Sequence, residues 1–119
     1  IIRQVFVAPT MKQAEAIAAP AIEHLYREVY GKASAAGDRN LVNDDGTVIT
    51  DHQTVTFETF KQRYIVGTPD FAIEEIAKYR DGLGCTEMVC WMHMPGIRGA
   101  DAQGSVELFA KEVMPRFPD

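Results

Sequence analysis

Two short stretches of the sequence carry residue types that can bind or react with a ligand. The first is Gly67-Thr68-Pro69-Asp70, which has the composition of a helix start. The N–H groups at a helix start can hold a phosphate, so Gly67 and Thr68 are candidate ligand-binding residues. A capped turn between a strand and a helix explains the same residues. The stretch is neither a Walker loop nor a GxGxxG motif.

The second stretch is the apolar run 86–94, which predicts a strand buried on both faces. His93 lies at the C-terminal end of this strand, where parallel α/β enzymes place their active sites, and its imidazole could accept a proton from a substrate. A histidine that is only hydrogen-bonded at a strand end is the alternative. Trp91 shares a face with His93, and Met94 belongs to the other face. Both are candidate substrate contacts, although Met and aromatic residues in such a run are more typical of a core.

Arg63 and the cysteines offer less specific chemistry. Arg63 precedes a short predicted strand, where it could bind an anionic substrate or remain a solvated charge. Cys85 and Cys90 are five residues apart, so on one strand they point to opposite faces and we expect no disulfide between them. Two cysteines fit a reduced, cytoplasmic setting. The histidines and cysteines do not form a metal-ligand pattern, so no metal site is predicted.

The composition restricts the class of protein. The chain has 119 residues, of which 46% are hydrophobic and 24% charged, as in an ordinary globular domain or a piece of one. The formal net charge of -5 argues against a nucleic acid or an anionic membrane surface as the main partner. No apolar run reaches the roughly 18 residues of a membrane span, and no signal peptide is visible. The chain starts at Ile1 on a strand-like run, as if cut from something longer.

The apolar pattern alternates strands with helices. It predicts strands at 1–8, 63–67 and 86–94, and helices at 11–30, 69–83 and 102–114. Pro20 should kink or divide the first helix, and Gly31 should end it. The last helix should be capped by Asp101 and bury Val106, Phe109, Ala110 and Val113.

Between these elements, residues 32–62 form a long excursion with a hairpin turn at Asp45-Gly46. Strands that alternate with helices imply an α/β fold with parallel pairing through right-handed crossovers. The chain therefore reads as one partial domain, 1–119, made of strand–helix 1–31, excursion 32–62 and strand–helix–strand–helix 63–119. It holds about three βα units, too few to close a (β/α)₈ barrel.

Several motifs in order carry a resemblance to a known family. These are Val5-Phe6-Val7-Ala8-Pro9-Thr10 with Ala14, Tyr64-Ile65-Val66-Gly67-Thr68-Pro69-Asp70, Met88-Val89-Cys90-Trp91-Met92-His93-Met94-Pro95-Gly96, and Ser105-Val106-Glu107-Leu108-Phe109-Ala110-Lys111-Glu112-Val113-Met114-Pro115. Together they resemble the C-terminal end of the luciferase-like flavin-dependent monooxygenases. The match spans most of the chain and weakens between residues 32 and 62.

The resemblance implies a TIM-barrel fold, of which this chain would form the last three βα units. It implies reduced flavin mononucleotide (FMN), or a deazaflavin in related enzymes, and insertion of one oxygen atom into a small organic substrate. His93 would donate to a flavin-bound peroxide, and the excursion would fall where bacterial luciferase has a mobile lid. The residues that hold the flavin phosphate in the family lie largely on earlier strands, so we expect no activity from this segment alone.

A second reading belongs to another class of protein. The chain could be a stand-alone α/β binding or interaction module, in which a second copy covers the open edges of the parallel sheet. A third reading is a subunit that completes a barrel supplied by another chain.

Overall fold

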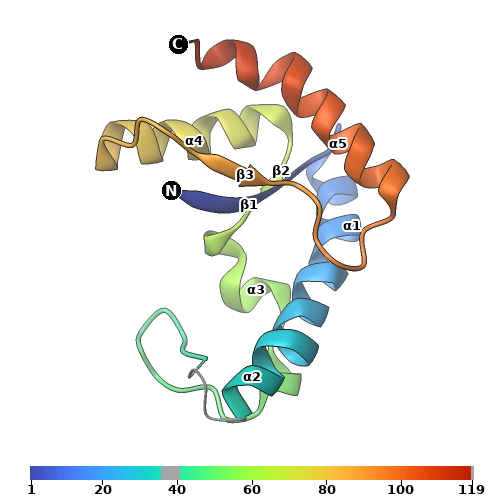
Figure 1. Ribbon diagram of the computed structural model, residues 1–119, viewed down its shortest axis with the longest axis vertical. Coiled ribbons are helices and arrows are strands. Elements are labelled where there is room, and N and C mark those ends of the chain that lie inside the picture. Colours follow the sequence, from blue (N-terminus) through green and yellow to red (C-terminus); the bar gives the residue numbers. More distant parts are fainter. Residues whose placement is uncertain (36–40, 119) are drawn as a thin grey trace.

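A computed structural model describes residues 1–35 and 41–118 of the chain (Figure 1). The three strands are β1 (Ile2–Val7), β2 (Ile65–Gly67) and β3 (Val89–Trp91), and the helices are α1 (Met11–His24), α2 (Gly31–Ala35), α3 (Phe57–Phe60), α4 (Pro69–Leu83) and α5 (Gly99–Glu112). A π-helical segment, Leu25–Tyr30, joins α1 to α2, and short 3₁₀ turns lie at His52–Thr54, Lys61–Arg63 and Met114–Arg116. The predicted alternation of strands and helices is confirmed.

The strands form a parallel sheet with the order β2-β1-β3. Val5–Val7 of β1 pair with β2, and Ile2–Gln4 of β1 pair with β3. The fold is therefore α/β with a small parallel sheet, as expected. Three consecutive barrel units would place β3 beside β2. Here β3 lies on the opposite side of β1 instead.

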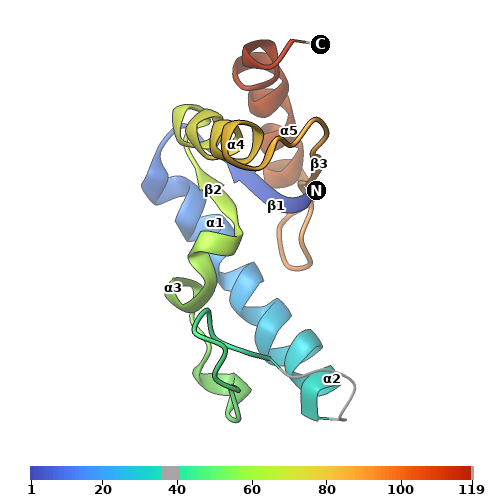
Figure 2. The same ribbon diagram turned by 90° about the vertical axis from the view of Figure 1, so that its left-hand side faces the viewer.

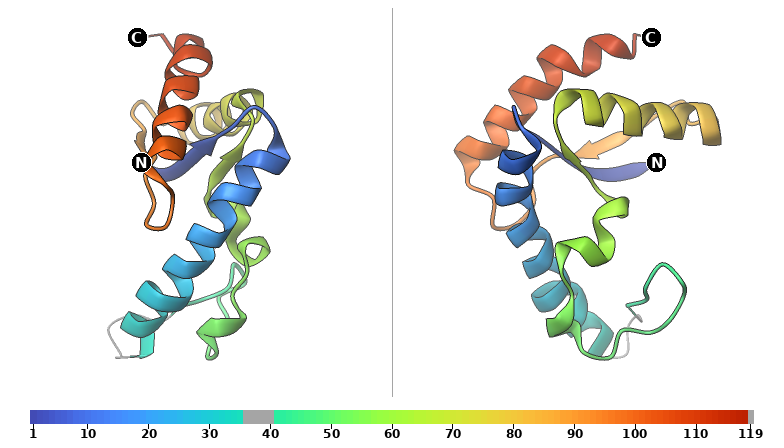
Figure 3. Two further views of the ribbon diagram at one scale, coloured as in Figure 1. Left: turned by 90° about the vertical axis from the view of Figure 1, so that its right-hand side faces the viewer. Right: turned by 180° about the vertical axis from the view of Figure 1, so that it is seen from behind.

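Helices cover both faces of the sheet (Figures 2 and 3). Phe6 and Ala8 point to the face that packs against α1 and α3, whereas Val5 and Val7 point to the face that packs against α4 and α5. This division follows from the alternation of side chains along β1. Pro69 at the start of α4 and the left-handed Gly84 after its end (φ 63°) agree with the predicted boundaries.

The first helix is not divided at Pro20 and does not end at Gly31, where its prediction was wrong. α1 continues through Pro20, and the chain remains helical past Gly31, which has ordinary helical angles. A Cβ at Gly31 would lie 2.7 Å from the Cβ of His52 and 2.9 Å from the carbonyl oxygen of Tyr26. Gly31 therefore allows the excursion to approach the helix closely, and it does not end the helix.

The predicted strand at 86–94 was wrong in length and in burial. β3 has three residues and lies at the edge of the sheet, with Val89 and Trp91 51% and 42% exposed. Met88, Cys90 and Met92 pack toward α4 and α5 as one set, as the alternation predicts. Met94 was expected with them but is fully buried in the cluster around α1, because the chain turns after β3.

The buried stripe of α5 also differs from its prediction. Phe109 and Val113 are buried as expected, but Val106 is 46% exposed and Ala110 is also exposed. Ala102 and Ser105 complete the buried face, which is rotated relative to the predicted stripe. The helix starts at Gly99, and Asp101 lies in its first turn, where its carboxylate pairs with Arg98.

The part of the excursion from Leu41 to Arg63 packs on the end of the first helix and lies away from the carboxyl ends of the strands (Figure 1). Residues 36–40 of the excursion lie outside the described residues. The ring of Phe60 is fully buried, with its centroid 4.3 Å from that of Tyr26. The Phe57 N–H donates to the Glu23 carboxylate at 2.9 Å. The predicted hairpin is confirmed, with Gly46 at a φ of 85°. Across the described residues, no helix is long and apolar enough to cross a membrane.

Candidate functional site

The carboxyl ends of β1 and β2 lie side by side and start two helices. The Ala8 N–H donates to the Gly67 carbonyl at 3.0 Å, directly before α1 and α4 begin. A Cβ at Gly67 would lie 2.6 Å from Met11 Sδ and 2.7 Å from the ring of Phe71. Gly67 is therefore needed for close packing between the first turns of α1 and α4.

Thr68 has the capping role that its position predicts. Its Oγ1 accepts a hydrogen bond from the Phe71 N–H at 3.2 Å. Pro69 has no N–H, and Asp70 places a carboxylate in the first turn of α4. Few donors remain for an anion at this helix start, and the carboxylate opposes one. The helix start thus fits a flavin phosphate poorly, and the capped turn accounts for Gly67 and Thr68.

A cavity of about 450 Å³ opens beside the carboxyl end of β1. It lies between β1, the first half of α1 and one side of α5 from Ala100 to Lys111. Its apolar lining includes Phe6, Ala8, Ile17 and Leu108, and its charged lining residues are Asp101, Glu107 and Lys111. In open α/β sheets, ligands bind in crevices outside the carboxyl ends of strands, where neighbouring connections leave toward opposite faces. The connection after β1 leads to α1 on one face, and the connection after β3 leads to α5 on the other.

Ser105 is the buried polar residue of this cavity, and sequence reasoning did not single it out. The residue is 2% exposed, and its Oγ accepts the Val7 N–H at 2.8 Å. β3 pairs only with residues 2–4 of β1, so the Val7 N–H has no strand partner on that side. The serine hydroxyl accepts the hydrogen bond that a neighbouring strand would otherwise accept. The available signal was a serine at the i−4 position of Phe109, on an otherwise apolar face.

His93 and Trp91 lie close together in the connection from β3 to α5. The Trp91 Nε1–H donates to the His93 carbonyl at 2.7 Å, and His93 Nε2 lies 3.2 Å from the Ile97 carbonyl. Both side chains are exposed, so the imidazole is accessible to a ligand at this edge. The geometry also matches the alternative interpretation of a histidine hydrogen-bonded at a strand end. Met94 does not lie with His93 and Trp91 on the surface, because its side chain is fully buried.

Arg63 lies at the other end of the sheet from His93, because Arg63 precedes β2 whereas His93 follows the parallel strand β3. Its guanidinium donates to Asp44 Oδ1 from Nε at 3.0 Å and from Nη2 at 2.6 Å. It also donates to the Val42 carbonyl at 3.0 Å and lies 4.1 Å from the ring centroid of Phe60. Burial acts to lower the pKa of Arg63, but the bond to Asp44 raises it overall. Arg63 thus joins the hairpin to β2 and is not near the carboxyl edge.

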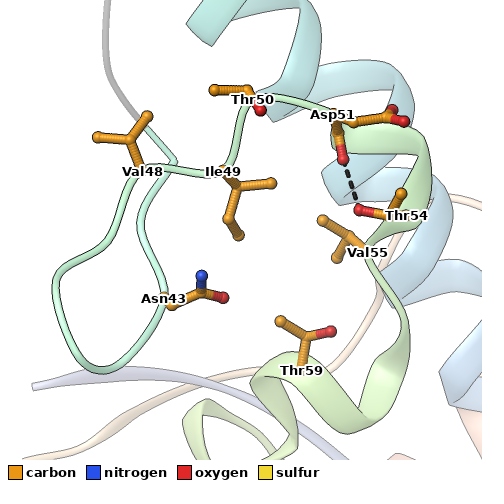
Figure 4. A pocket seen from close by; sticks show the side chains of 8 residues that line it. All are labelled: Asn43, Val48, Ile49, Thr50, Asp51, Thr54, Val55 and Thr59. Carbon is orange, nitrogen blue, oxygen red and sulfur yellow. Dashed lines mark hydrogen bonds between the residues drawn. The ribbon is translucent and has the colours of Figure 1, made fainter.

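A second cavity of about 320 Å³ lies inside the excursion (Figure 4). Asn43, Thr50, Asp51, Thr54 and Thr59 line it, together with Val48, Ile49 and Val55. The Thr54 hydroxyl donates to the Asp51 carbonyl at 2.7 Å. The lining is more polar than that of the cavity beside β1. It can take a small polar molecule, but none of the predicted site residues lies there.

The thiol of Cys90 on β3 does not have the properties of an activated nucleophile. Burial raises the pKa of the Cys90 thiol, which therefore stays protonated near neutral pH. Cys85 and Cys90 are both free, as expected. Within residues 1–35 and 41–118, no group of three His, Cys, Asp or Glu side chains could hold a metal ion.

No family model matches the sequence, and no curated protein matches it. Two of the solved structures that share the fold are monooxygenases. One is monooxygenase RslO1 from Streptomyces bottropensis, with a TM-score of 0.71 and 15% identity over 98% of this chain and 30% of that one. The other is the oxygenating constituent of 3,6-diketocamphane monooxygenase from Pseudomonas putida, a type II Baeyer-Villiger monooxygenase in complex with FMN. Its TM-score is 0.68 and its identity 20%, over 99% of this chain and 33% of that one. The chain spans about a third of the length of both.

Proposed function

We propose that this chain is the C-terminal part of a flavin-dependent, luciferase-like monooxygenase. The observation that carries the proposal is the likeness of nearly the whole chain to about a third of two monooxygenases, one of them an FMN complex. The ordered motifs from Val5 to Pro115 support the same family. In the complete enzyme, reduced FMN, or a deazaflavin in a related enzyme, would supply the oxygen or hydride chemistry.

The arrangement of the neighbouring strands β1 and β3 supports the barrel part of the proposal. They are parallel, and α4 and α5 cover the same face of both. Adjacent parallel strands with helices on one face are the arrangement of a barrel wall, and in this chain α1 also packs on the opposite face of β1. The radius of gyration is 15.0 Å, above the roughly 13.5 Å expected for a compact domain of this length, which supports a part of a larger body.

Within that enzyme, this segment would shape the substrate side of the site. The apolar cavity beside β1 would hold a small organic substrate. His93 does not line this cavity, but its exposed imidazole, in the connection from β3 to α5, would be available to move a proton. Trp91 would be a substrate contact beside His93. The helix start at Gly67 and Thr68 fits the flavin phosphate poorly, so residues outside this chain would hold it. The segment alone would then be inactive.

Intact mass of the protein isolated from its source cells tests the proposal. We expect a mass about three times the 13.2 kDa of this chain, since the chain covers about a third of its structural neighbours. That longer protein should quench FMN fluorescence on titration and consume oxygen when FMN is kept reduced, whereas the 119-residue chain should show no turnover. A source protein of 13.2 kDa, or a long form that fails to bind either FMN or a deazaflavin, would overturn it.

A second candidate is a non-catalytic α/β module that self-associates. The observation that favours it is the open edge of β3, where an apolar strand lies at the end of the sheet.

A further inference from the structure

The turn that follows β3 has a fixed backbone conformation. Pro95 and Gly96 are its two central residues, and the Ile97 N–H donates to the Met94 carbonyl at 3.1 Å. Gly96 has a φ of 94°, as a type II turn requires at its second central position. The side chains of Met94 and Ile97 are buried in the cluster that packs on α1. Both ends of the turn are therefore anchored in the core.

His93 comes directly before this turn and is held at two points. Its ring nitrogen Nε2 lies 3.2 Å from the Ile97 carbonyl oxygen on the far side of the turn. Its own carbonyl accepts the Trp91 Nε1–H at 2.7 Å. Among the residues that the structure describes, no hydrogen bond reaches His93 Nδ1. These contacts are local, so they are the same whether or not further strands flank the chain in a longer protein.

The contact with Ile97 decides which ring nitrogen of His93 carries the proton. A carbonyl oxygen can only accept a hydrogen bond, so the nitrogen bonded to it must be the donor. In the neutral ring, Nε2 therefore carries the proton and Nδ1 carries the lone pair. A histidine that is oriented through one nitrogen and open at the other has the arrangement of a general base.

We infer that His93 is a general base that acts through Nδ1 and that the type II turn positions it. The inference rests on the proposed function, which supplies the substrate. Nδ1 accepts a proton from the substrate, which is left as its conjugate base, and the ring becomes an imidazolium with a proton on each nitrogen. Nε2–H keeps its bond to the Ile97 carbonyl, and this bond is stronger when the ring is charged. Transfer of the Nδ1 proton to the reacted substrate or to water restores the neutral ring.

Nitrogen-15 NMR of the histidine side chains measures the tautomer in the flavin-free protein. At about pH 9 ordinary histidines are neutral, so the two ring nitrogens have distinct shifts. We expect His93 to be protonated on Nε2, with a tautomer ratio about fivefold larger than that of His24. His24 is the internal reference, because its side chain is exposed and no hydrogen bond reaches its ring within the described part of the chain. A proton on Nδ1 of His93, or a ratio equal to that of His24, overturns the inference.

Gly96→Ala tests whether the turn holds the ring. Alanine strongly disfavours a φ of 94°, so the turn should shift and the tautomer ratio of His93 should fall toward that of His24. A Cβ at Gly96 would lie 3.7 Å from the Cβ of Ala21, which is an ordinary contact, so the effect comes from the backbone angle. Gly84→Ala is the matched control, since Gly84 also has a positive φ but lies after α4. It should leave the ratio within about twofold. Equal effects of the two substitutions contradict the role of the turn.

His93→Gln separates proton transfer from a structural role in the longer, flavin-loaded protein. Glutamine places its amide nitrogen near the position of Nε2, so it can still donate to the Ile97 carbonyl, but it has no base at the position of Nδ1. We expect the melting temperature to stay within about 3 °C and turnover to fall about 100-fold or more.

The probes for this turnover are reduced FMN, oxygen and a panel of small aldehydes and ketones, because a carbonyl group acidifies the neighbouring C–H. A His93→Gln variant with the turnover of the parent overturns the inference, since a hydrogen bond alone would then be sufficient. A parent protein that oxidises none of the panel counts against the proposed function instead. The NMR measurement needs no flavin, so the two failures are distinguishable.

Discussion

Val7 and Ser105 are joined by a buried hydrogen bond of 2.8 Å, although 98 positions separate them in the sequence. The bond connects the central strand to α5 at the point where β3 leaves β1. It satisfies a backbone N–H that would otherwise be buried without a partner in the sheet. The serine therefore fixes α5 against the wall of the cavity beside β1.

Replacement of Ser105 by alanine should destabilise the fold by about 1–3 kcal/mol, because the Val7 N–H loses its partner inside the protein. Urea unfolding followed by circular dichroism measures the change. Gly104→Ala is the control in the same helix, since a Cβ there meets nothing within 4 Å. It should stabilise by roughly 0.5–1 kcal/mol through helix propensity. A Ser105→Ala variant as stable as the parent would contradict the role of this bond.

Gly67→Ala should lower the free energy of unfolding by about 1–3 kcal/mol, because the added methyl group would lie closer to Met11 and Phe71 than van der Waals contact allows. The matched control is Gly82→Ala in α4, where a Cβ meets nothing within 4 Å. Thermal unfolding of the two variants compares the sites directly. An equal effect of both substitutions would show that Gly67 is not required for packing.

Several features that depend on neighbours in the sequence were predicted correctly. Thr68 caps its helix, and Gly46 has a positive φ, as their local residues indicate. Each of these depends on atoms within about four residues, so composition is sufficient to find it. The α/β class follows in the same way from the alternation of apolar periods.

The sheet order and the candidate site depend on contacts between distant segments, and these the sequence did not reveal. An apolar run such as 86–94 suits a strand covered on both faces, but the structure places β3 at an edge. The partner of Ser105 is 98 residues away, so its role could not follow from local pattern. Gly31 has the residue type of a helix end, yet its close approach to His52 decides its role.

Arg63→Lys should loosen the hairpin from β2 at a cost of about 1 kcal/mol, since lysine keeps the charge but loses the forked contact with Asp44. Amide exchange in residues 41–50 should become faster, while exchange in the sheet stays unchanged. Arg98→Lys is the control, because the Arg98–Asp101 pair is on the surface. If exchange in the hairpin is unaffected by Arg63→Lys, then Arg63 does not hold it.

The hairpin should also lose order in acid through Asp45. Its carboxylate accepts the Thr47 hydroxyl at 2.7 Å and the Thr47 N–H at 2.9 Å, and these bonds lower the pKa of Asp45 below its usual value of 3.8. A lowered pKa in the folded state means that the contribution is complete above about pH 4 and disappears as the pH falls through the folded-state pKa. The chemical shift and exchange rate of the Thr47 amide, followed by NMR from pH 6 to pH 2, should report this loss. In Asp45→Asn the side chain still accepts a hydrogen bond but does not titrate, so the Thr47 signals should stay nearly constant. An unchanged acid transition in that variant would assign the effect to another group.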